Sequence, residues 1–253
     1  MRRTYRFAIA VLAVLILVVI FFYPLCRALG GAFAHSRDGA QIAAYPAELK
    51  AEVADRGGTY LSYADTPPCL VDALMSVEDK RFFSHGGIDP VAAVRVFFEE
   101  FQNDHLDHGG STITQQLARA ILGIPRGQSF GFGYIASELR IARGALILEH
   151  DFSKEEILEL YLNSVYFGRG ATGASAAAED YFGMPLGALS TGQCAYLAGL
   201  PQAPTIFGQD PSGAVAESRY RHVIATMQRN GYLTPAQEAT LDQETLFTSE
   251  PQY

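Results

Sequence analysis

An uncharged apolar stretch near the N-terminus limits the architectures open to this chain. Residues 7–23 carry no charge, and the uncharged run continues through Cys26, twenty residues in all. A helix of that length rises about 1.5 Å per residue and spans a hydrocarbon core about 30 Å thick. Arg2, Arg3 and Arg6 precede the run, and the positive-inside rule places such a flank in the cytoplasm. The sequence therefore predicts one N-terminal transmembrane helix, with the chain beyond it outside the cytoplasmic membrane.

A cleaved signal peptide is the alternative for this segment. Ala32-Phe33-Ala34 offers a small-x-small cleavage site. The apolar run is longer than the ~7–15 residues of a usual signal core. A retained anchor is therefore favoured over a cleaved signal.

The rest of the chain suits a single well-cored domain. About 220 residues follow the anchor, enough for one such domain and too few for two large ones. We expect residues 1–29 to form the cytoplasmic tip and anchor, and residues 30–64 a membrane-proximal connector with one short helix after Pro46. Residues 65–245 would then form the main domain. The 27 acidic residues outnumber the 19 basic ones, which argues against a nucleic-acid partner.

Helix signals dominate beyond residue 64. No segment shows the sustained period-two alternation of a hairpin, so the domain is predicted to be mainly α. A helix is predicted over residues 134–149, and an Ala-rich helix is predicted to end at Gly183. Helix-start signals occur at Asp65–Pro68, Asp89-Pro90, Ser111, Ser153, Ser190 and Thr234.

The three cysteines, Cys26, Cys69 and Cys194, lack the spacing of metal ligands. Because their number is odd, at least one is unpaired. A Cys69–Cys194 disulfide is compatible with an exported domain. The favoured interpretation is that the cysteines are small, buried hydrophobic side chains.

Glu78 is the first candidate for chemistry. Leu70, Leu74 and Glu78 are spaced four apart, so Glu78 continues an apolar line on the inward face of a helix. Partial desolvation raises the pKa of a carboxyl group and suits it to general acid or base work. The structural alternative is that Glu78 and Asp79 solvate a helix end, with His85 as a polar neighbour.

Two glycine-containing loops supply further candidates. Gly109 and Gly110 lead into a helix start rich in hydroxyl and amide groups, which suits an anionic or sugar ligand; the alternative is a solvated helix face. Arg169 lies in the glycine-rich turn 168–173. It suits a phosphate contact, and close backbone packing is the alternative there.

Four segments in this order resemble the bacterial peptidoglycan glycosyltransferases. They are EDKRFFSHGGID (78–89), GGSTITQQLAR (109–119), SKEEILELYLN (153–163) and FGRGATGASAAAEDYFG (167–183). The family includes the N-terminal module of class A penicillin-binding proteins and the monofunctional transglycosylases. The similarity runs over about residues 65–237 and includes LAGLPQAP at 197–204 and the later segment Arg219–Tyr232.

The resemblance implies a lysozyme-like, mainly α-helical glycosyltransferase domain that polymerises lipid II. Glu78 would be the catalytic base in an inverting transfer that releases undecaprenyl pyrophosphate. The matching motif positions imply nine substrate-binding residues: Asp79, His85, Ser111, Thr112, Gln115, Gln116, Arg119, Lys154 and Arg169.

The chain departs from the family at its third motif. Ile141 stands where the family places a second catalytic Glu. Glu138 lies three residues earlier, between Ser137 and the basic residues Arg140 and Arg143, and is predicted to substitute in part as the second catalytic carboxylate. On this hypothesis Glu138→Gln weakens activity, and Ile141→Glu restores or raises it.

Two other functions compete with polymerisation. A degenerate family member would bind lipid II or cell-wall synthesis partners with little or no catalysis. A glycan-cleaving enzyme would use Glu78 as an acid. In the leading interpretation no cofactor or metal site is required, although a divalent cation beside the pyrophosphate is compatible with it. The expected partners are lipid II, the lipid-linked glycan strand, the cytoplasmic membrane and other cell-wall synthesis proteins, with the catalytic domain outside the membrane (periplasmic).

Overall fold

The computed structural model describes residues 28–92, 110–125, 131–243 and 246–247. The predicted anchor at residues 7–26 lies outside the described residues. Among those described, no helix is both long and apolar enough to cross a membrane.

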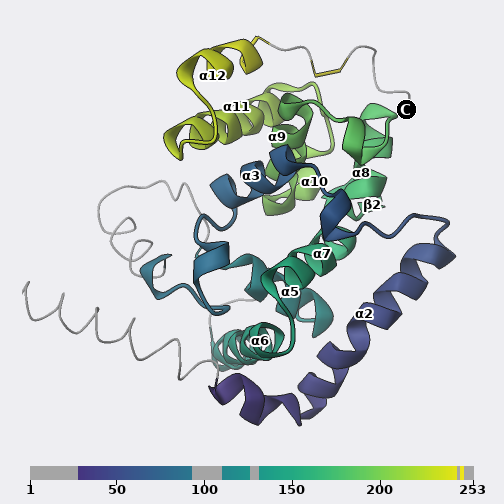
Figure 1. Cartoon of the computed structure of the whole chain (residues 1–253), viewed down its shortest axis with the longest axis vertical. Helices are drawn as coiled ribbons and strands as arrows, with labels where there is room; N and C mark the ends of the chain where they lie inside the picture. Colours follow the sequence, from purple (N-terminus) through teal and green to yellow (C-terminus); the bar gives the residue numbers. More distant parts are fainter. Residues whose placement is uncertain (1–27, 93–109, 126–130, 244–245, 248–253) are drawn as a thin grey trace, which may run out of the picture. The chain divides into compact units, whose positions relative to one another are not determined.

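The described part of the chain is mainly helical, which confirms that prediction (Figure 1). Short 3-10 turns occur between several of the helices. The α-helices are α2 (Arg37–Asp55), α3 (Pro68–Val77), α5 (Ile113–Ile121), α6 (Phe132–Asp151), α7 (Lys154–Ser164), α8 (Ala174–Phe182), α9 (Thr191–Gly199), α10 (Pro204–Phe207), α11 (Ala214–Arg229) and α12 (Pro235–Leu241).

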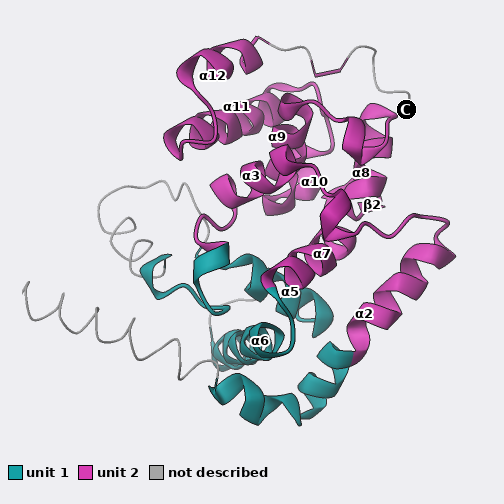
Figure 2. Cartoon of the chain, viewed as in Figure 1, with its two compact units in different colours: residues 1–43, 83–153 teal, residues 44–82, 154–253 magenta. Residues whose placement is uncertain are grey.

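The chain divides into two compact units, shown in different colours in Figure 2. Unit 1 contains residues 1–43 and 83–153, and unit 2 contains residues 44–82 and 154–253.

Unit 1 is built on the packing of α5 against α6. Ile113, Leu117 and Ile121 recur every four residues on α5 and are buried, as expected for the inward face of an amphipathic helix. The N-cap of α5 is Thr112, one residue later than the predicted Ser111. Thr112 has the extended backbone of an N-cap, and its hydroxyl accepts the N–H of Gln115, so Thr112 rather than Ser111 closes the capping box.

In unit 2, α3, α9 and α11 pack on one another. The α3 helix begins at Pro68, where the missing N–H of proline costs no helical hydrogen bond. Cys69 on α3 and Cys194 on α9 form a disulfide, with their Cα atoms 5.8 Å apart. The favoured interpretation of these cysteines as unpaired hydrophobic side chains was therefore wrong, because α3 packs along α9 and brings the two thiols together.

The α2 helix is longer than the short helix expected after Pro46. It runs over Arg37–Asp55 with Pro46 inside it. Ile42, Leu49 and Val53 are buried at helical spacing. Burial of this apolar face outweighs the hydrogen bond that an internal proline removes.

A small hairpin replaces part of the predicted glycine-rich turn. Strand β1 (Tyr166–Gly168) pairs antiparallel with β2 (Ala171–Thr172). Strands this short carry too little alternation to be recognised in a sequence. The following helix, α8, ends at Gly183 in the left-handed conformation, as predicted.

Candidate active site

Glu78 is the C-cap residue of α3 and belongs to unit 2. Leu74 and Leu70, one and two turns earlier, are fully buried, so the predicted inward line exists. The side chain of Glu78 is only 9% exposed. The helix thus delivers a carboxylate to a largely desolvated position, where a proton acceptor is shielded from bulk water.

Arg219 on α11 is the partner of Glu78 that sequence reasoning missed. Its guanidinium lies 3.8 Å from a carboxylate oxygen of Glu78. Burial lowers the pKa of Arg219, and the charge of Glu78 opposes that shift. Arg219 lies in a helix that the resemblance covers, but a helical arginine gives no sign in the sequence of which carboxylate it will meet.

Two other predicted residues belong to unit 2: Asp79, which follows Glu78, and Lys154, in the segment 153–163. Asp79 is buried, and its carbonyl oxygen accepts the N–H of Phe82. Lys154 begins α7, and its ammonium lies 4.4 Å from the centre of the Phe82 ring. This cation–π contact holds the positive charge of Lys154 beside the segment that follows Glu78.

In unit 1, one hydrogen-bonded loop joins the predicted residues of the first two motifs. His85 is buried, and its Nδ1 accepts the N–H of Gly87 at 3.1 Å. The hydroxyl of Thr112 donates to the carbonyl oxygen of Gly87 at 2.6 Å, and the amide oxygen of Gln115 accepts the Thr112 N–H at 2.9 Å. His85, Thr112 and the Gln115 amide oxygen therefore shape the loop.

The remaining predicted residues at this helix start differ in exposure. Ser111 is exposed, and Gln116 is half-buried in the first turn of α5. The exposure of Ser111 leaves its hydroxyl accessible to a ligand.

Arg119 and Glu138 form an ion pair between α5 and α6. A guanidinium nitrogen of Arg119 lies 2.7 Å from a carboxylate oxygen of Glu138. The Glu138 side chain is 33% exposed, and that of Arg119 is 20% exposed. The candidate second carboxylate thus meets a motif cation at a partly open surface of unit 1.

Ile141, one turn further along α6, is 1% exposed and belongs to the core of unit 1. The arginines on either side of it are used elsewhere, because Arg140 and Arg143 both bind the carboxylate of Asp38. The hydrogen bond from Arg140 holds the pKa of Asp38 below its usual value, against the opposing effect of burial. Both guanidinium groups are therefore engaged by Asp38 within unit 1.

Arg169 lies at the tip of the hairpin with an unusual backbone. Its φ of +53° is a left-handed conformation that side chains other than glycine rarely adopt. Asp180 pairs with its Nε at 2.8 Å, and the ring of Tyr181 lies 5.3 Å from the guanidinium carbon. Left-handed backbone at a residue other than glycine is concentrated at ligand sites, so the strain keeps Arg169 among the binding candidates.

A cavity of about 710 Å³ opens beside this hairpin within unit 2. Its lining combines hydroxyl groups of Thr59, Thr172 and Ser175 with one guanidinium, Arg56, and one carboxylate, Glu179. Polar groups of this kind, converging on a concave surface, suit a hydroxyl-rich ligand. Among the described residues, no group of three or more His, Cys, Asp or Glu side chains is placed to hold a metal ion.

These features define a helical domain with a buried carboxylate at a helix end and cations at several motif positions. The family model described as "Transglycosylase" matches residues 47–228. The chain belongs to this transglycosylase family, which supports the lysozyme-like fold predicted from the motifs.

Penicillin-binding proteins 1A are among the similar proteins. That of Haemophilus influenzae is 36% identical over 200 residues, 77% of this chain and 22% of the relative. That of Aquifex aeolicus is 38% identical over 178 residues, 70% of this chain and 24% of the relative. That of Escherichia coli is 36% identical over 197 residues, 78% of this chain and 22% of the relative. The chain thus spans less than a quarter of the length of these relatives.

A crystal structure of the Haemophilus influenzae protein aligns with a TM-score of 0.43 at 21% identity, over 77% of this chain and 19% of that one. The family assignment rests on the sequence matches alone.

Proposed function

We propose that this chain is a peptidoglycan glycosyltransferase that polymerises lipid II into glycan strands. The observation that carries the proposal is Glu78, a 9%-exposed carboxylate at the end of α3 with a guanidinium 3.8 Å away. It occupies the first motif of a transglycosylase-family domain. A carboxylate held in this way suits proton abstraction from a hydroxyl group.

In the proposed reaction Glu78 takes the proton of the acceptor sugar's 4-hydroxyl. The oxygen then forms a bond to the anomeric carbon of the lipid-linked donor with inversion. The bond from that carbon to the pyrophosphate oxygen breaks, and the electron pair leaves with undecaprenyl pyrophosphate. Cationic side chains stabilise the charge that develops on this leaving group, and Arg119, Lys154 and Arg169 are the proposed sources.

Glu138 is the proposed second catalytic carboxylate. Two observations support this: its side chain is partly exposed, and it pairs with Arg119 of the second motif. The buried position of Ile141 favours Glu138 over a site at residue 141. We assign Asp79, His85, Ser111, Thr112, Gln115 and Gln116 to shaping or contacting the substrate site.

The second candidate function is binding of lipid II or cell-wall synthesis partners without efficient catalysis. It is favoured by one observation, the apolar and buried Ile141 at the position where the family carries its second Glu. Both functions use the same substrate, so a binding measurement alone does not separate them.

The test is polymerisation of lipid II by the purified full-length protein. We expect glycan strands from the wild type and a loss of roughly 100-fold or more in Glu78→Gln, because a general base contributes about 10²–10⁴-fold to a rate. The fold should survive, since Gln keeps the shape of Glu, and thermal unfolding checks this. Lipid II binding without strand formation by the wild type would favour the second function, and near-normal synthesis by Glu78→Gln would remove Glu78 as the base.

A further inference from the structure

We propose that Arg219 is a positioning residue that fixes the carboxylate of Glu78 for proton transfer. The proposal rests on the function proposed above and adds a residue that lies outside the four motif segments and was not among the predicted site residues. Both side chains are only 9% exposed, and their charged groups are 3.8 Å apart. An ion of either sign at such a buried position requires a partner of opposite charge.

The guanidinium of Arg219 is fixed from three directions within unit 2. Its Nε donates to the carbonyl oxygen of Gly199 at the end of α9, at 3.0 Å. Its central carbon lies 5.6 Å from the centre of the Phe207 ring on α10. The third contact is Glu78 on α3. Because three separate elements set its place, Arg219 has little freedom to follow a moving carboxylate.

Gly199 makes this arrangement possible. A Cβ atom at residue 199 would lie 3.2 Å from Cγ of Arg219 and 3.5 Å from its Nε. The first of these contacts is tighter than packed side chains normally allow, and the second is an ordinary van der Waals contact. The absence of a side chain at the end of α9 therefore lets the arginine stem pass close to the backbone and reach Glu78.

The distance between the charges indicates what Arg219 does. At 3.8 Å the contact is longer than a hydrogen bond. Arg219 therefore attracts this carboxylate oxygen by its charge and does not donate a hydrogen bond to it. This contact places a fixed positive charge beside the carboxylate and so orients Glu78. A small misplacement of a base is sufficient to slow proton transfer substantially.

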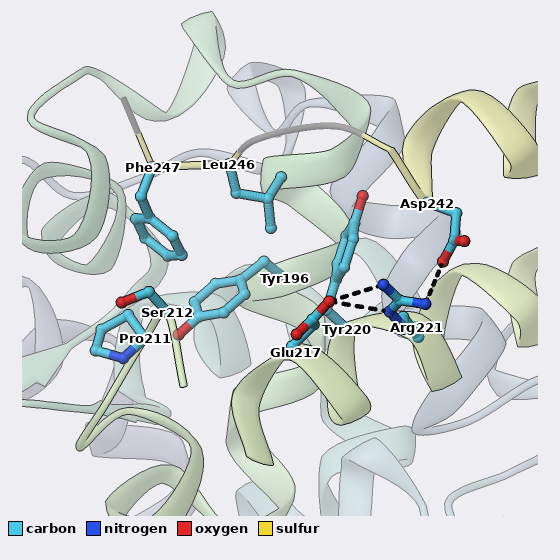
Figure 3. Close-up of a pocket in the computed structure, with 9 residues that line it drawn as sticks. All are labelled: Tyr196, Pro211, Ser212, Glu217, Tyr220, Arg221, Asp242, Leu246 and Phe247. Atoms are coloured by element: carbon cyan, nitrogen blue, oxygen red, sulfur yellow. Dashed lines mark hydrogen bonds and ion pairs between the residues drawn. The ribbon is translucent and has the colours of Figure 1, made fainter. Parts of the chain in front are cut away.

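Arg221 offers a matched control on the same helix. It lies two residues further along α11 and pairs with Glu217 at 2.7 Å and with Asp242 at 3.5 Å. Figure 3 shows it between these two carboxylates in a separate pocket of about 250 Å³. Its side chain is 52% exposed. Surface ion pairs of this kind contribute little to stability, and this one does not involve Glu78.

The experiment measures kcat and KM for lipid II polymerisation in four full-length proteins, with thermal unfolding as the check on folding. They are the wild type, Arg219→Gln, Arg219→Lys and Arg221→Gln. We expect Arg219→Gln to lower kcat roughly 10- to 100-fold with little change in KM, and Arg219→Lys to recover part of that loss because it keeps the charge. Arg221→Gln should stay within about twofold of the wild type, since exposed ion pairs matter little.

Several results would overturn the proposal. A folded Arg219→Gln protein with normal kcat would do so. Equal losses of kcat in Arg219→Gln and Arg219→Lys, in proportion to a lower melting temperature, would also do so. If Arg219→Gln does not fold, Arg219→Lys decides, and an unchanged kcat there removes the positioning role. A wild type that forms no glycan defeats the proposed function itself, and this proposal with it. A normal wild type with an inactive Glu78→Gln and an unaffected Arg219→Gln defeats this proposal alone.

Discussion

Glu138 and Ile141 are one turn apart on α6, yet their surroundings differ completely. The carboxylate of Glu138 is partly exposed and bound to Arg119, whereas Ile141 is a core side chain. The sequence places both residues near the same motif position but does not show which of them faces inward. Packing of α6 against α5 decides this, because it turns Ile141 into the core of unit 1.

Ile141→Glu is therefore expected to harm the protein, contrary to the sequence-based expectation of restored activity. A carboxylate at a position that is 1% exposed would be buried, and the nearby Arg140 and Arg143 already bind Asp38. Loss of stability of about 3 kcal/mol or more is expected for an uncompensated buried charge. Chemical denaturation measures it, with Ile141→Leu as the control that keeps the apolar character. A stable and more active Ile141→Glu protein would show that this position faces the substrate after all.

Glu138→Gln tests the second carboxylate directly. We expect at least about a tenfold lower rate of polymerisation, because a residue in an acid or base role contributes 10²–10⁴-fold and the proposed substitution is partial. Glu217→Gln is the matched control, since Glu217 also pairs with an arginine but on the surface of α11. Equal rates in Glu138→Gln and the control would exclude Glu138 from the chemistry.

At the scale of elements, the disulfide ties α3, which ends at Glu78, to α9. The two cysteines are 125 residues apart, and closing a loop of that length restricts the unfolded chain strongly. Removal of such a disulfide typically costs 2–5 kcal/mol. We expect this loss in Cys69→Ala/Cys194→Ala, measured by denaturant unfolding under oxidising conditions.

Cys26→Ala is the control for this experiment, because Cys26 does not take part in the disulfide. Dithiothreitol should lower the melting temperature of the wild type and of Cys26→Ala while leaving the double variant unchanged. A double variant as stable as the wild type would mean that the link adds nothing to unit 2.

Local signals in the sequence predicted those elements whose ends depend on neighbouring residues. The capping boxes of Ser190 with Gln193 and of Thr234 with Gln237 start α9 and α12 where expected. The length of α2 and the small hairpin depend instead on distant packing, which no local pattern records. The same limit applies to the site. The spacing of Leu70, Leu74 and Glu78 predicted the inward position of Glu78, whereas its pairing with Arg219 joins residues 141 positions apart (219 − 78).

At the scale of the whole molecule, we propose that the catalytic domain acts outside the cytoplasmic membrane. Residues 7–26 would anchor the protein, with the N-terminus inside the cell. The disulfide within unit 2 supports export, because disulfides persist mainly in oxidising compartments. We expect the protein to stay with membranes after a high-salt wash, and a reporter fused after Tyr253 to be active only outside the cytoplasm. A soluble product beginning near His35 would instead indicate a cleaved signal peptide.

The disulfide also imposes an order of events during synthesis. Chains grow at about 5–20 residues per second, so Cys194 follows Cys69 after about 6–25 s, given the separation of 125 residues. During that interval the first available thiol partner for Cys69 is Cys26, only 43 positions earlier (69 − 26). A premature Cys26–Cys69 bond would have to be reshuffled by thiol–disulfide exchange before α3 could settle on α9. The yield of correctly paired protein should therefore depend on a disulfide isomerase in cells that carry Cys26, and lose that dependence when Cys26 is replaced.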